Sequence, residues 1–521
     1  INGGGTRDLG PIIAQAGHWP LIPGTNQSIT VTCRVVQAFA PVASVTLHWR
    51  VMYGATAVAS MFDDGLHGDG AAGDGVYGAI IPNKVGANWT YSAGQMVRWY
   101  FTAADTQGES SRWPLFEDPE GSAEYLGTVV QPNYVVSKLP VVHFFVSNYT
   151  AGVGVDNPNK TGGRASVYYD GEFYDNVFMK VRGNTTAGYL KKSHSVIFNR
   201  EHPFRHPGPG GRVRKTSWTA DYPDPTYMRQ GLAFWLCEQM GAPGPFYYPM
   251  RLQMNGAFYQ LANHNDLHDG ELLERLGYDP DGALYNAAGT IVPSQFSTGG
   301  FDKKTRQWEG NADYTALANA ISESLSVGQR HTNIFDRLDL PQVINYLAAA
   351  RFVHENDDVW ANMSLYHDND GDDLWRIIPF DMNLSWGAAF MDLAAFDGIQ
   401  VTNDNLKSFP LYGSSKAIPD GMSNWNRIYD VIFSVPQTRE MFLRRMRTLL
   451  DTYVKPPGTP ANQLVLEPLA LAWRDLIGDE AELDRNTWGW PAKGGQCNFD
   501  PGIRVTNGVN ILINEFIAAR T

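Results

Sequence analysis

The chain has 521 residues, of which 43% are hydrophobic, and carries 41 basic against 54 acidic side chains for a net charge of -13. This composition excludes a disordered chain, and the length predicts two or more domains. The acidic balance argues against a dedicated nucleic-acid surface. No apolar run approaches the roughly 18 residues of a membrane-spanning helix. The three cysteines are widely separated, which predicts no disulfide framework. Because the chain begins at Ile1, we expect a processed or trimmed start.

The N-terminal quarter is predicted to be all β. Residues 1–26 have little periodicity and are interpreted as a lead-in or edge segment. Beyond them, alternating apolar residues occur in the runs SITVTCRVV, SVTLHWRVMY and QMVRWYFTAAD, with turn-rich connectors between them. Several short strands without a convincing helix predict a β-sandwich of immunoglobulin or fibronectin type over residues 27–130.

One loop of the predicted sandwich concentrates carboxylates among glycines, namely Asp63, Asp64, Asp69 and Asp74. Clustered carboxylates on a flexible loop could bind Ca²⁺, which takes six to eight oxygen ligands. The alternative is a series of Asp-Gly turns, in which each carboxylate accepts hydrogen bonds from nearby backbone. The spacing does not match an EF-hand, so we favour turns over a calcium site.

A linker over residues 131–140 leads into a second predicted domain, residues 141–521, whose first strand is VVHFFVS. Further on, a turn containing Gly and Asn precedes Lys191 and Lys192 and a strand-like run, Ser193 to Phe198. A lysine at the head of a strand beside such a turn can reach nucleotide phosphates. Adjacent lysines are more often solvated surface, and this segment alone does not decide between the two interpretations.

A predicted helix, DLPQVINYLAAARFV, carries Asp339 as N-cap and Gln342 to complete a capping box, and it leads to an acidic stretch. There, two strand-like runs flank the turn DNDGDD and predict a hairpin. Asp357 and Asn362 lie at one open end, and Asp381 lies at the other. An Asp, an Asn five residues on and a second Asp beyond a hairpin form the hydroxyl-orienting and metal-binding arrangement of protein kinases.

The acids of this stretch do not all share one expected role. Asp358 either faces elsewhere or serves as an alternate metal ligand. Four turn acids are expected to stay solvated at the far end of the hairpin, namely Asp368, Asp370, Asp372 and Asp373. The competing interpretation of the whole stretch is helix capping and turn formation.

Several segments in order resemble the CotH kinase-like family, named for a bacterial spore-coat protein. They are RGNTTAGYLKKSHSVIF, TYMRQGLAFWLCEQMGAP, MRLQMNGAFYQL, DDVWANMSLYHDNDG and IIPFDMNLSWG. The resemblance implies a multidomain protein in which an N-terminal all-β sandwich precedes an α+β, atypical protein-kinase-like domain. It further implies a secreted or surface-associated enzyme that binds ATP with Mg²⁺ or Mn²⁺ and phosphorylates Ser or Thr of an extracellular or surface protein.

The resemblance also assigns roles to individual residues. Arg182 and Asn184 fall in the turn before the nucleotide lysine, which is Lys191 or Lys192. Alternation favours Lys192, and the choice stays open. The acidic partner of the lysine also stays open between Glu238 and Asp266.

The site roles follow the same resemblance. Asp357 would orient the acceptor hydroxyl, and Asn362 and Asp381 would hold the metal. Two alternatives remain: a degenerate kinase fold acting as an adhesin or scaffold, and an enzyme that transfers a nucleotide or an amino acid instead of phosphate. The sequence does not predict the oligomeric state.

Overall fold

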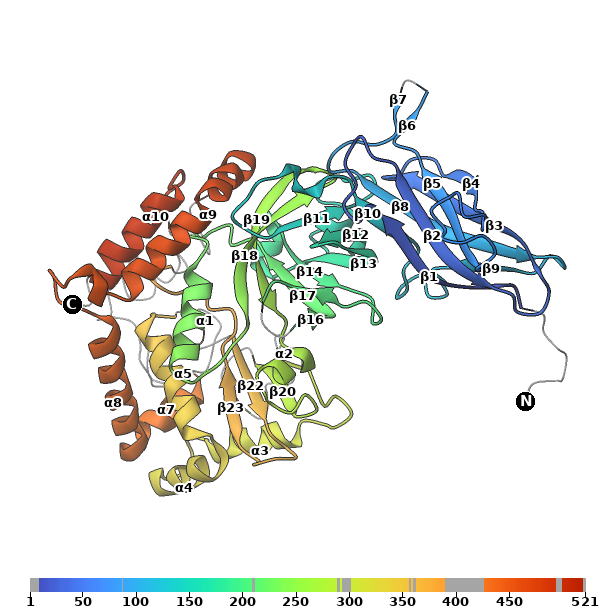
Figure 1. Ribbon diagram of the computed structural model, residues 1–521. Coiled ribbons are helices and arrows are strands. Elements are labelled where there is room, and N and C mark those ends of the chain that lie inside the picture. Colours follow the sequence, from blue (N-terminus) through green and yellow to red (C-terminus); the bar gives the residue numbers. More distant parts are fainter. Residues whose placement is uncertain are drawn as a thin grey trace.

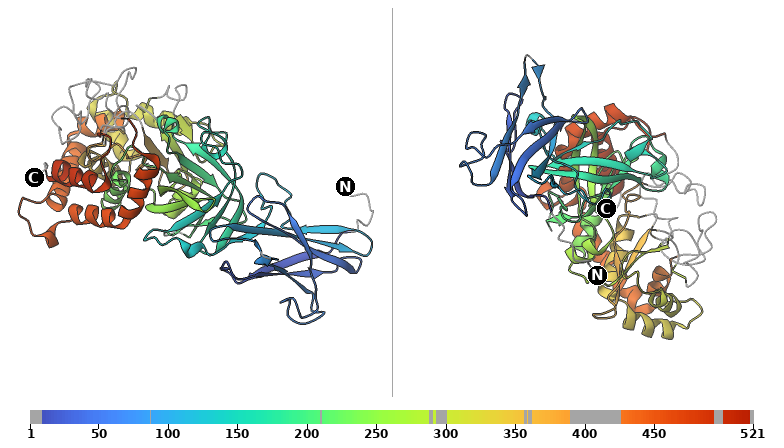
Figure 2. Two further views of the ribbon diagram at one scale, coloured as in Figure 1. Left: turned by 90° about the horizontal axis from the view of Figure 1, so that it is seen from above. Right: turned by 90° about the vertical axis from the view of Figure 1, so that its right-hand side faces the viewer.

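The structure, a computed structural model, describes residues 9–86, 88–208, 211–287, 291–292, 301–355, 358, 362–388, 426–492 and 499–518. Three parts follow one another along the molecule: a β-sandwich at one end, a β-barrel in the middle and a largely helical part at the other end (Figures 1 and 2). Among the described residues, no helix combines the length and apolar character needed to cross a bilayer.

The N-terminal part is a sandwich of two sheets. The first sheet has the order β1(Ile12–Trp19)-β2(Ile29–Val36)-β5(Val76–Ile81). The second has the order β10(Leu126–Val129)-β8(Met96–Asp105)-β3(Val42–Val51)-β4(Ala57–Ser60), with β9(Ser110–Trp113) on β8, and a short hairpin joins β6(Lys84–Val85) to β7(Asn88–Trp89). Alternate residues of β2 and β8 face each other across the core, so the two-residue periodicity of these runs correctly predicted a sandwich.

The predicted lead-in segment contains the edge strand β1, which pairs antiparallel with β2. A bulge between Ala14 and Gly17 shifts the register of this pairing. The bulge interrupts the alternation of buried and exposed residues, which explains why residues 1–26 lack the periodicity of a strand. The sheet therefore begins before residue 27.

The middle part is a closed barrel of seven strands. Its order is β11(Val141–Phe145)-β12(Gly163–Tyr169)-β13(Glu172–Arg182)-β14(Ser193–Ile197)-β17(Lys215–Thr219)-β19(Ala257–Asp266)-β18(Tyr247–Met254). A parallel pairing between β11 and β18 closes the barrel, whereas the other neighbours are antiparallel. A small hairpin of β15(Phe204–Arg205) and β16(Arg212–Val213) extends from it.

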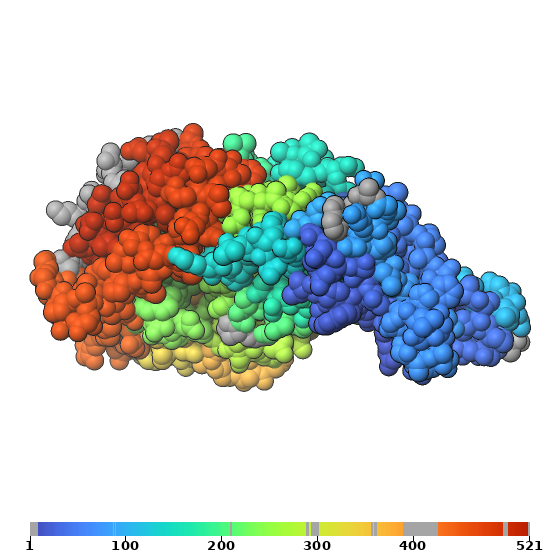
Figure 3. Space-filling model, turned by 45° about the horizontal axis from the view of Figure 1, so that its top comes forward, coloured from blue at the N-terminus to red at the C-terminus, as the bar shows by residue number. Residues whose placement is uncertain are grey.

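A buried ion pair joins the sandwich to the barrel, whose surfaces meet in Figure 3. Arg98 of β8 lies 3.8 Å from Asp175 of β13, and both side chains are about 5% exposed or less. The Asp175 carboxylate also accepts hydrogen bonds from the Ser166 hydroxyl and from the backbone N–H groups of Glu124 and Tyr125. Burial raises the pKa of Asp175, while Arg98 lowers it. The Arg98 guanidinium therefore compensates the charge of the buried Asp175 carboxylate.

The third part combines a small sheet with helices. The sheet has the order β21(Phe301–Lys303)-β20(Ala283–Ala287)-β22(Met363–His367)-β23(Trp375–Ile378). The helices include α1(Arg229–Gln239), α2(Gly270–Arg275), α3(Ala312–Ala320), α4(Val327–Arg337), α5(Leu340–Phe352), α7(Arg427–Ser434), α8(Pro436–Tyr453), α9(Leu466–Trp488) and α10(Val505–Ile511). A large apolar core joins α1, α5, α7, α8 and α9.

The predicted helix before the acidic stretch is α5, and Asp339 caps it by accepting a hydrogen bond from the Gln342 N–H at 3.2 Å. The predicted capping box is wrong. The Gln342 side chain instead bonds both the N–H and the carbonyl of Ile377 on β23. The amide thus ties α5 to the hairpin that carries Asn362 and Asp381 at its open ends.

Candidate active site

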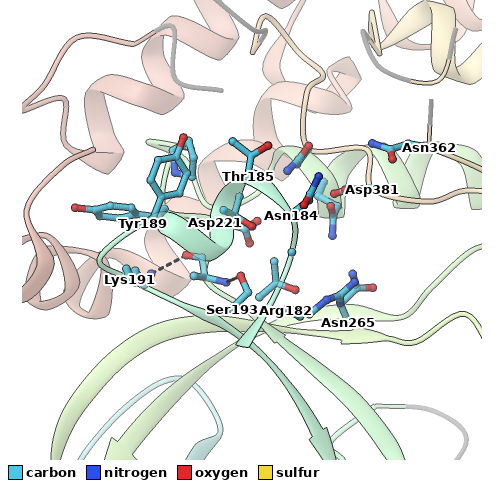
Figure 4. A pocket seen from close by; sticks show the side chains of 18 residues that line it. Arg182, Asn184, Thr185, Tyr189, Lys191, Ser193, Asp221, Asn265, Asn362 and Asp381 are labelled. Carbon is cyan, nitrogen blue, oxygen red and sulfur yellow. Dashed lines mark hydrogen bonds between the residues drawn. The ribbon is translucent and has the colours of Figure 1, made fainter. Parts of the chain in front are cut away.

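A polar pocket of about 240 Å³ lies where the barrel meets the helical part. Its walls come from the end of β13 and the turn after it, the connection from β17 to α1, the end of β19, and the two open ends of the β22–β23 hairpin. In Figure 4, Tyr189 and Lys191 enter from one side, and Asn362 and Asp381 enter from the other. Residues far apart in the chain therefore share one cavity.

The turn after β13 depends on Gly183, which has a φ of +95°. A Cβ at this position would lie 2.0 Å from the Thr186 hydroxyl, so a side chain is excluded by space as well as by conformation. The turn brings Arg182, at the end of β13, and Asn184 to the pocket wall. Both residues thus line the pocket, and their role in nucleotide binding stays a prediction.

The structure distinguishes the two lysines. Lys191 lines the pocket and is fully buried, and its ammonium lies 2.8 Å from Asp484 of α9. It also donates to the carbonyls of Ala220 and Leu261, each at 2.7 Å. Burial lowers the pKa of Lys191 to about 8, although Asp484 opposes that change. Lys192 instead donates to the Ala187 carbonyl at 2.8 Å and is not part of the pocket wall.

Neither acid considered as the partner of the lysine occupies that position. Glu238 is exposed on α1. Asp266 pairs with Arg275 at 2.6 Å. The partner is Asp484, which also accepts from the Tyr227 hydroxyl at 2.8 Å and the Leu261 N–H at 2.9 Å. Asp484 lies in the last turns of α9 and is fully buried, and no local sequence pattern distinguishes it from an ordinary helix acid.

Asp221 is a pocket residue that the sequence analysis missed. It follows β17 and has a φ of +44°, a conformation that Asp tolerates better than most residues. One carboxylate oxygen accepts from the Tyr247 hydroxyl and from the Asn263 amide, the latter at 2.7 Å. Burial raises the pKa of Asp221 to about 6, partly offset by the Tyr247 hydrogen bond. The segment TADYPDP contained no pattern that separates this carboxylate from an ordinary turn acid.

The hairpin after α5 forms as predicted, with Ser364 paired to Ile378 and His367 paired to Trp375. Asn362 and Asp381 therefore both lie at its open end, and both line the pocket. Their φ values are +49° and +50°. Burial raises the pKa of Asp381, and the neighbouring Arg182 guanidinium lowers it.

The remaining acids of this stretch lie elsewhere or outside the described residues. Asp357, the predicted hydroxyl-orienting residue, lies outside the described residues. Asp358 is buried against Arg351 and the Tyr429 hydroxyl, so it holds the helical core together and does not line the pocket. Asp370, Asp372 and Asp373 are exposed at the far end of the hairpin, and Asp368 is partly exposed there.

The pocket offers hard oxygen donors to a cation, since Asn362 contributes an amide and Asp381 a carboxylate. Such donors fit Mg²⁺ or Mn²⁺ when nucleotide phosphates and water supply the other ligands. No cluster of three or more His, Cys, Asp or Glu side chains is arranged around a metal position within the described part of the chain.

The acidic loop of the sandwich is organised by its own backbone. Asp69 accepts hydrogen bonds from the N–H groups of Asp64, Gly65 and His67, at 2.7–2.9 Å. Asp63 and Asp74 accept in the same way from residues of the loop. This geometry agrees with the Asp-Gly turns that we favoured. The calcium alternative for Asp63, Asp64, Asp69 and Asp74 stays a prediction.

Comparison with known proteins agrees with this architecture. An N-terminal segment, residues 34–100, matches the model of the conditioned medium factor 2nd Ig-like domain. The "Inner spore coat protein H" of Bacillus subtilis (strain 168) is 22% identical over 217 residues, which cover 40% of this chain and 58% of that protein. The chain therefore spans less than two thirds of the length of this relative. The model described as CotH kinase protein matches residues 179–516, which are more than half of the chain and include the pocket segments. The chain belongs to the CotH kinase protein family.

Proposed function

We propose that this protein is a metal-dependent, ATP-binding transferase that moves the γ-phosphoryl group to a Ser or Thr hydroxyl of an extracellular or surface protein. The observation that carries the proposal is the convergence of Arg182, Lys191, Asn362 and Asp381 on one pocket. These are the residue types that phosphoryl transfer requires: cations for phosphate charge, and oxygen donors for a metal ion.

Each residue has a role that follows from its chemistry. Arg182 lies at the pocket wall near Asp381, and its guanidinium can donate two parallel hydrogen bonds to phosphate oxygens. Lys191, held by Asp484, provides a fixed positive charge beside the same cavity. Asn362 and Asp381 would hold a divalent cation, which would neutralise charge on the phosphates. Asp357 is the proposed hydroxyl-orienting residue.

The proposed surface location rests on the relative. Its name describes it as a spore-coat protein, so we propose that this chain also acts outside the cytoplasm or at a surface. The acceptor would then be a protein encountered there. An adhesin with a degenerate site, and a transferase that moves a nucleotide or an amino acid, are the alternative outcomes of the test below.

The experiment is calorimetric titration of the protein with ATP, with and without Mg²⁺ or Mn²⁺. We expect metal-dependent binding that Asp381→Ala abolishes. The matched control is Asp373→Ala, because Asp373 is 79% exposed at the other end of the same hairpin. Intact-mass analysis of acceptor proteins then identifies the transferred group, and addition of a phosphoryl group is the expected result. Lack of ATP binding by the unmodified protein would favour the adhesin or scaffold.

A further inference from the structure

Asp221 has one carboxylate oxygen engaged by the protein and one that is not. The Oδ2 atom accepts from the Tyr247 hydroxyl and the Asn263 amide. Within the described ranges, Oδ1 accepts no hydrogen bond, yet the residue is only 8% exposed and lines the pocket. In Figure 4 its side chain lies between Lys191 and Asp381. An oxygen that accepts no hydrogen bond from the protein, on a carboxylate that lines the pocket, is available to a ligand in that pocket.

The charges around the pocket indicate what that partner is. The ammonium of Lys191 is balanced by Asp484 behind it. Among the described residues of the pocket wall, Arg182 is near two carboxylates, Asp221 and Asp381, and interacts with both. Polyphosphate entering such a cavity is repelled by the excess negative charge. A divalent cation removes the repulsion and satisfies the free oxygen.

We propose that Asp221 supplies a further oxygen ligand for the divalent cation of this pocket, in addition to Asn362 and Asp381. The inference rests on the proposed function, because the cation is the one that accompanies the nucleotide. Three hard oxygen donors from three separate segments are a suitable set for Mg²⁺ or Mn²⁺, and the phosphates and water would complete the coordination. Tyr247 and Asn263 fix the orientation of the carboxylate, which is how residues around a ligand normally support it.

The test uses Asp221→Asn. The asparagine oxygen can keep both hydrogen bonds from Tyr247 and Asn263, while an NH₂ group replaces the free oxygen. Mn²⁺ binding to the protein is measured by electron paramagnetic resonance, and ATP binding is measured by calorimetry with and without Mn²⁺. We expect Mn²⁺ affinity to fall on the order of 10- to 100-fold. ATP binding without metal should stay the same or tighten, since one negative charge is lost.

A purely electrostatic or structural role predicts other results. If Asp221 only repels phosphate, Asp221→Asn tightens ATP binding with and without Mn²⁺ and leaves Mn²⁺ affinity unchanged, which overturns the inference but not the proposed function. If the unmodified protein binds neither Mn²⁺ nor ATP, the proposed function fails, and the inference fails with it. Asp373→Asn serves as the control for general charge removal.

A second variant keeps the inference testable if Asp221→Asn does not fold. Asp221→Cys places a thiolate where the oxygen ligand would be, and thiolates prefer softer metals. We expect this variant to bind Cd²⁺ with the ultraviolet charge-transfer absorption of a Cd–thiolate bond, and to prefer Cd²⁺ over Mn²⁺ more strongly than the unmodified protein does. A folded Cys variant without that absorption contradicts the assignment.

Discussion

The buried pair between Arg98 and Asp175 makes a quantitative prediction about how the sandwich and the barrel depend on each other. Arg98→Met removes the guanidinium and leaves the Asp175 carboxylate about 4% exposed. Removing one partner of a buried ion pair costs about 3–5 kcal/mol. The carboxylate keeps three hydrogen bonds, and burial raises its pKa, so it can take up a proton. Both effects limit the cost, so we expect Arg98→Met to lower the free energy of opening this junction by about 3 kcal/mol.

Amide hydrogen exchange with mass spectrometry measures this cost locally. The N–H groups of Glu124 and Tyr125 donate to Asp175, so their exchange reports opening of the junction. A loss of about 3 kcal/mol predicts exchange on the order of 100-fold faster in the peptide that contains them. Arg34→Met is the matched control, because Arg34 is exposed on the outer face of β2.

A double-variant cycle separates the ion pair from the packing of the arginine. Arg98 also lies over the rings of Tyr53 and Tyr125, at 4.5 and 4.4 Å from their centres. If the uncompensated charge of Asp175 causes most of the loss, adding Asp175→Asn to Arg98→Met restores at least half of the lost protection from hydrogen exchange. Exchange in Arg98→Met at the rate of the unmodified protein would contradict a dominant ion pair. A second substitution that only adds to the loss of protection would contradict it as well.

Three further predictions concern other polar contacts. Lys191→Met should destabilise the protein by about 3–5 kcal/mol in urea unfolding, because Asp484 is left buried without its cation. The pKa of the Glu172 carboxyl is lowered to about 2, mainly by hydrogen bonds from the Arg212 guanidinium. Its contribution to the free energy of unfolding is therefore complete above pH 4.5 and is lost as the pH falls through 2. The stability difference between Glu172→Gln and the unmodified protein should narrow between pH 6 and pH 3, and a constant difference would contradict the lowered pKa. Asp69→Ala should lower the melting temperature of the sandwich, because the loop loses the hydrogen bonds that Asp69 accepts. Adding Ca²⁺ or a chelator should leave the melting temperature of the unmodified protein unchanged. A higher melting temperature with Ca²⁺ would support the calcium alternative.

Sequence patterns over short stretches predicted the elements that form from neighbouring residues. The hairpin that brings Asn362 and Asp381 together was visible because two apolar runs flank a turn-forming segment. Alternation predicted β2, β3 and β8 of the sandwich, whereas the bulge in β1 removes the alternation of that strand. The helix α5 was visible from its apolar spacing and its Asp339 cap.

Long-range contacts could not be predicted in this way. The parallel pairing of β11 with β18 closes the barrel, and no local period encodes which distant strand a strand joins. The burial of Asp221 and Asp484 depends on elements that are remote in the chain, so each looked like an ordinary polar residue. The choice between Lys191 and Lys192 depended on the register at the first residue of a strand, where alternation is least secure.

The pairing of Lys191 with Asp484 of α9 has a consequence for folding during synthesis. Synthesis runs from the N-terminus, and domains generally fold as units while the chain emerges. The barrel can form its strands early, but Lys191 lacks its ion-pair partner Asp484 until α9 has been synthesised and has docked. A chain truncated before α9 would contain Arg182, Asn362 and Asp381 and still lack a stable pocket. We therefore expect a gene fragment with those motifs alone not to encode the pocket in a stable form.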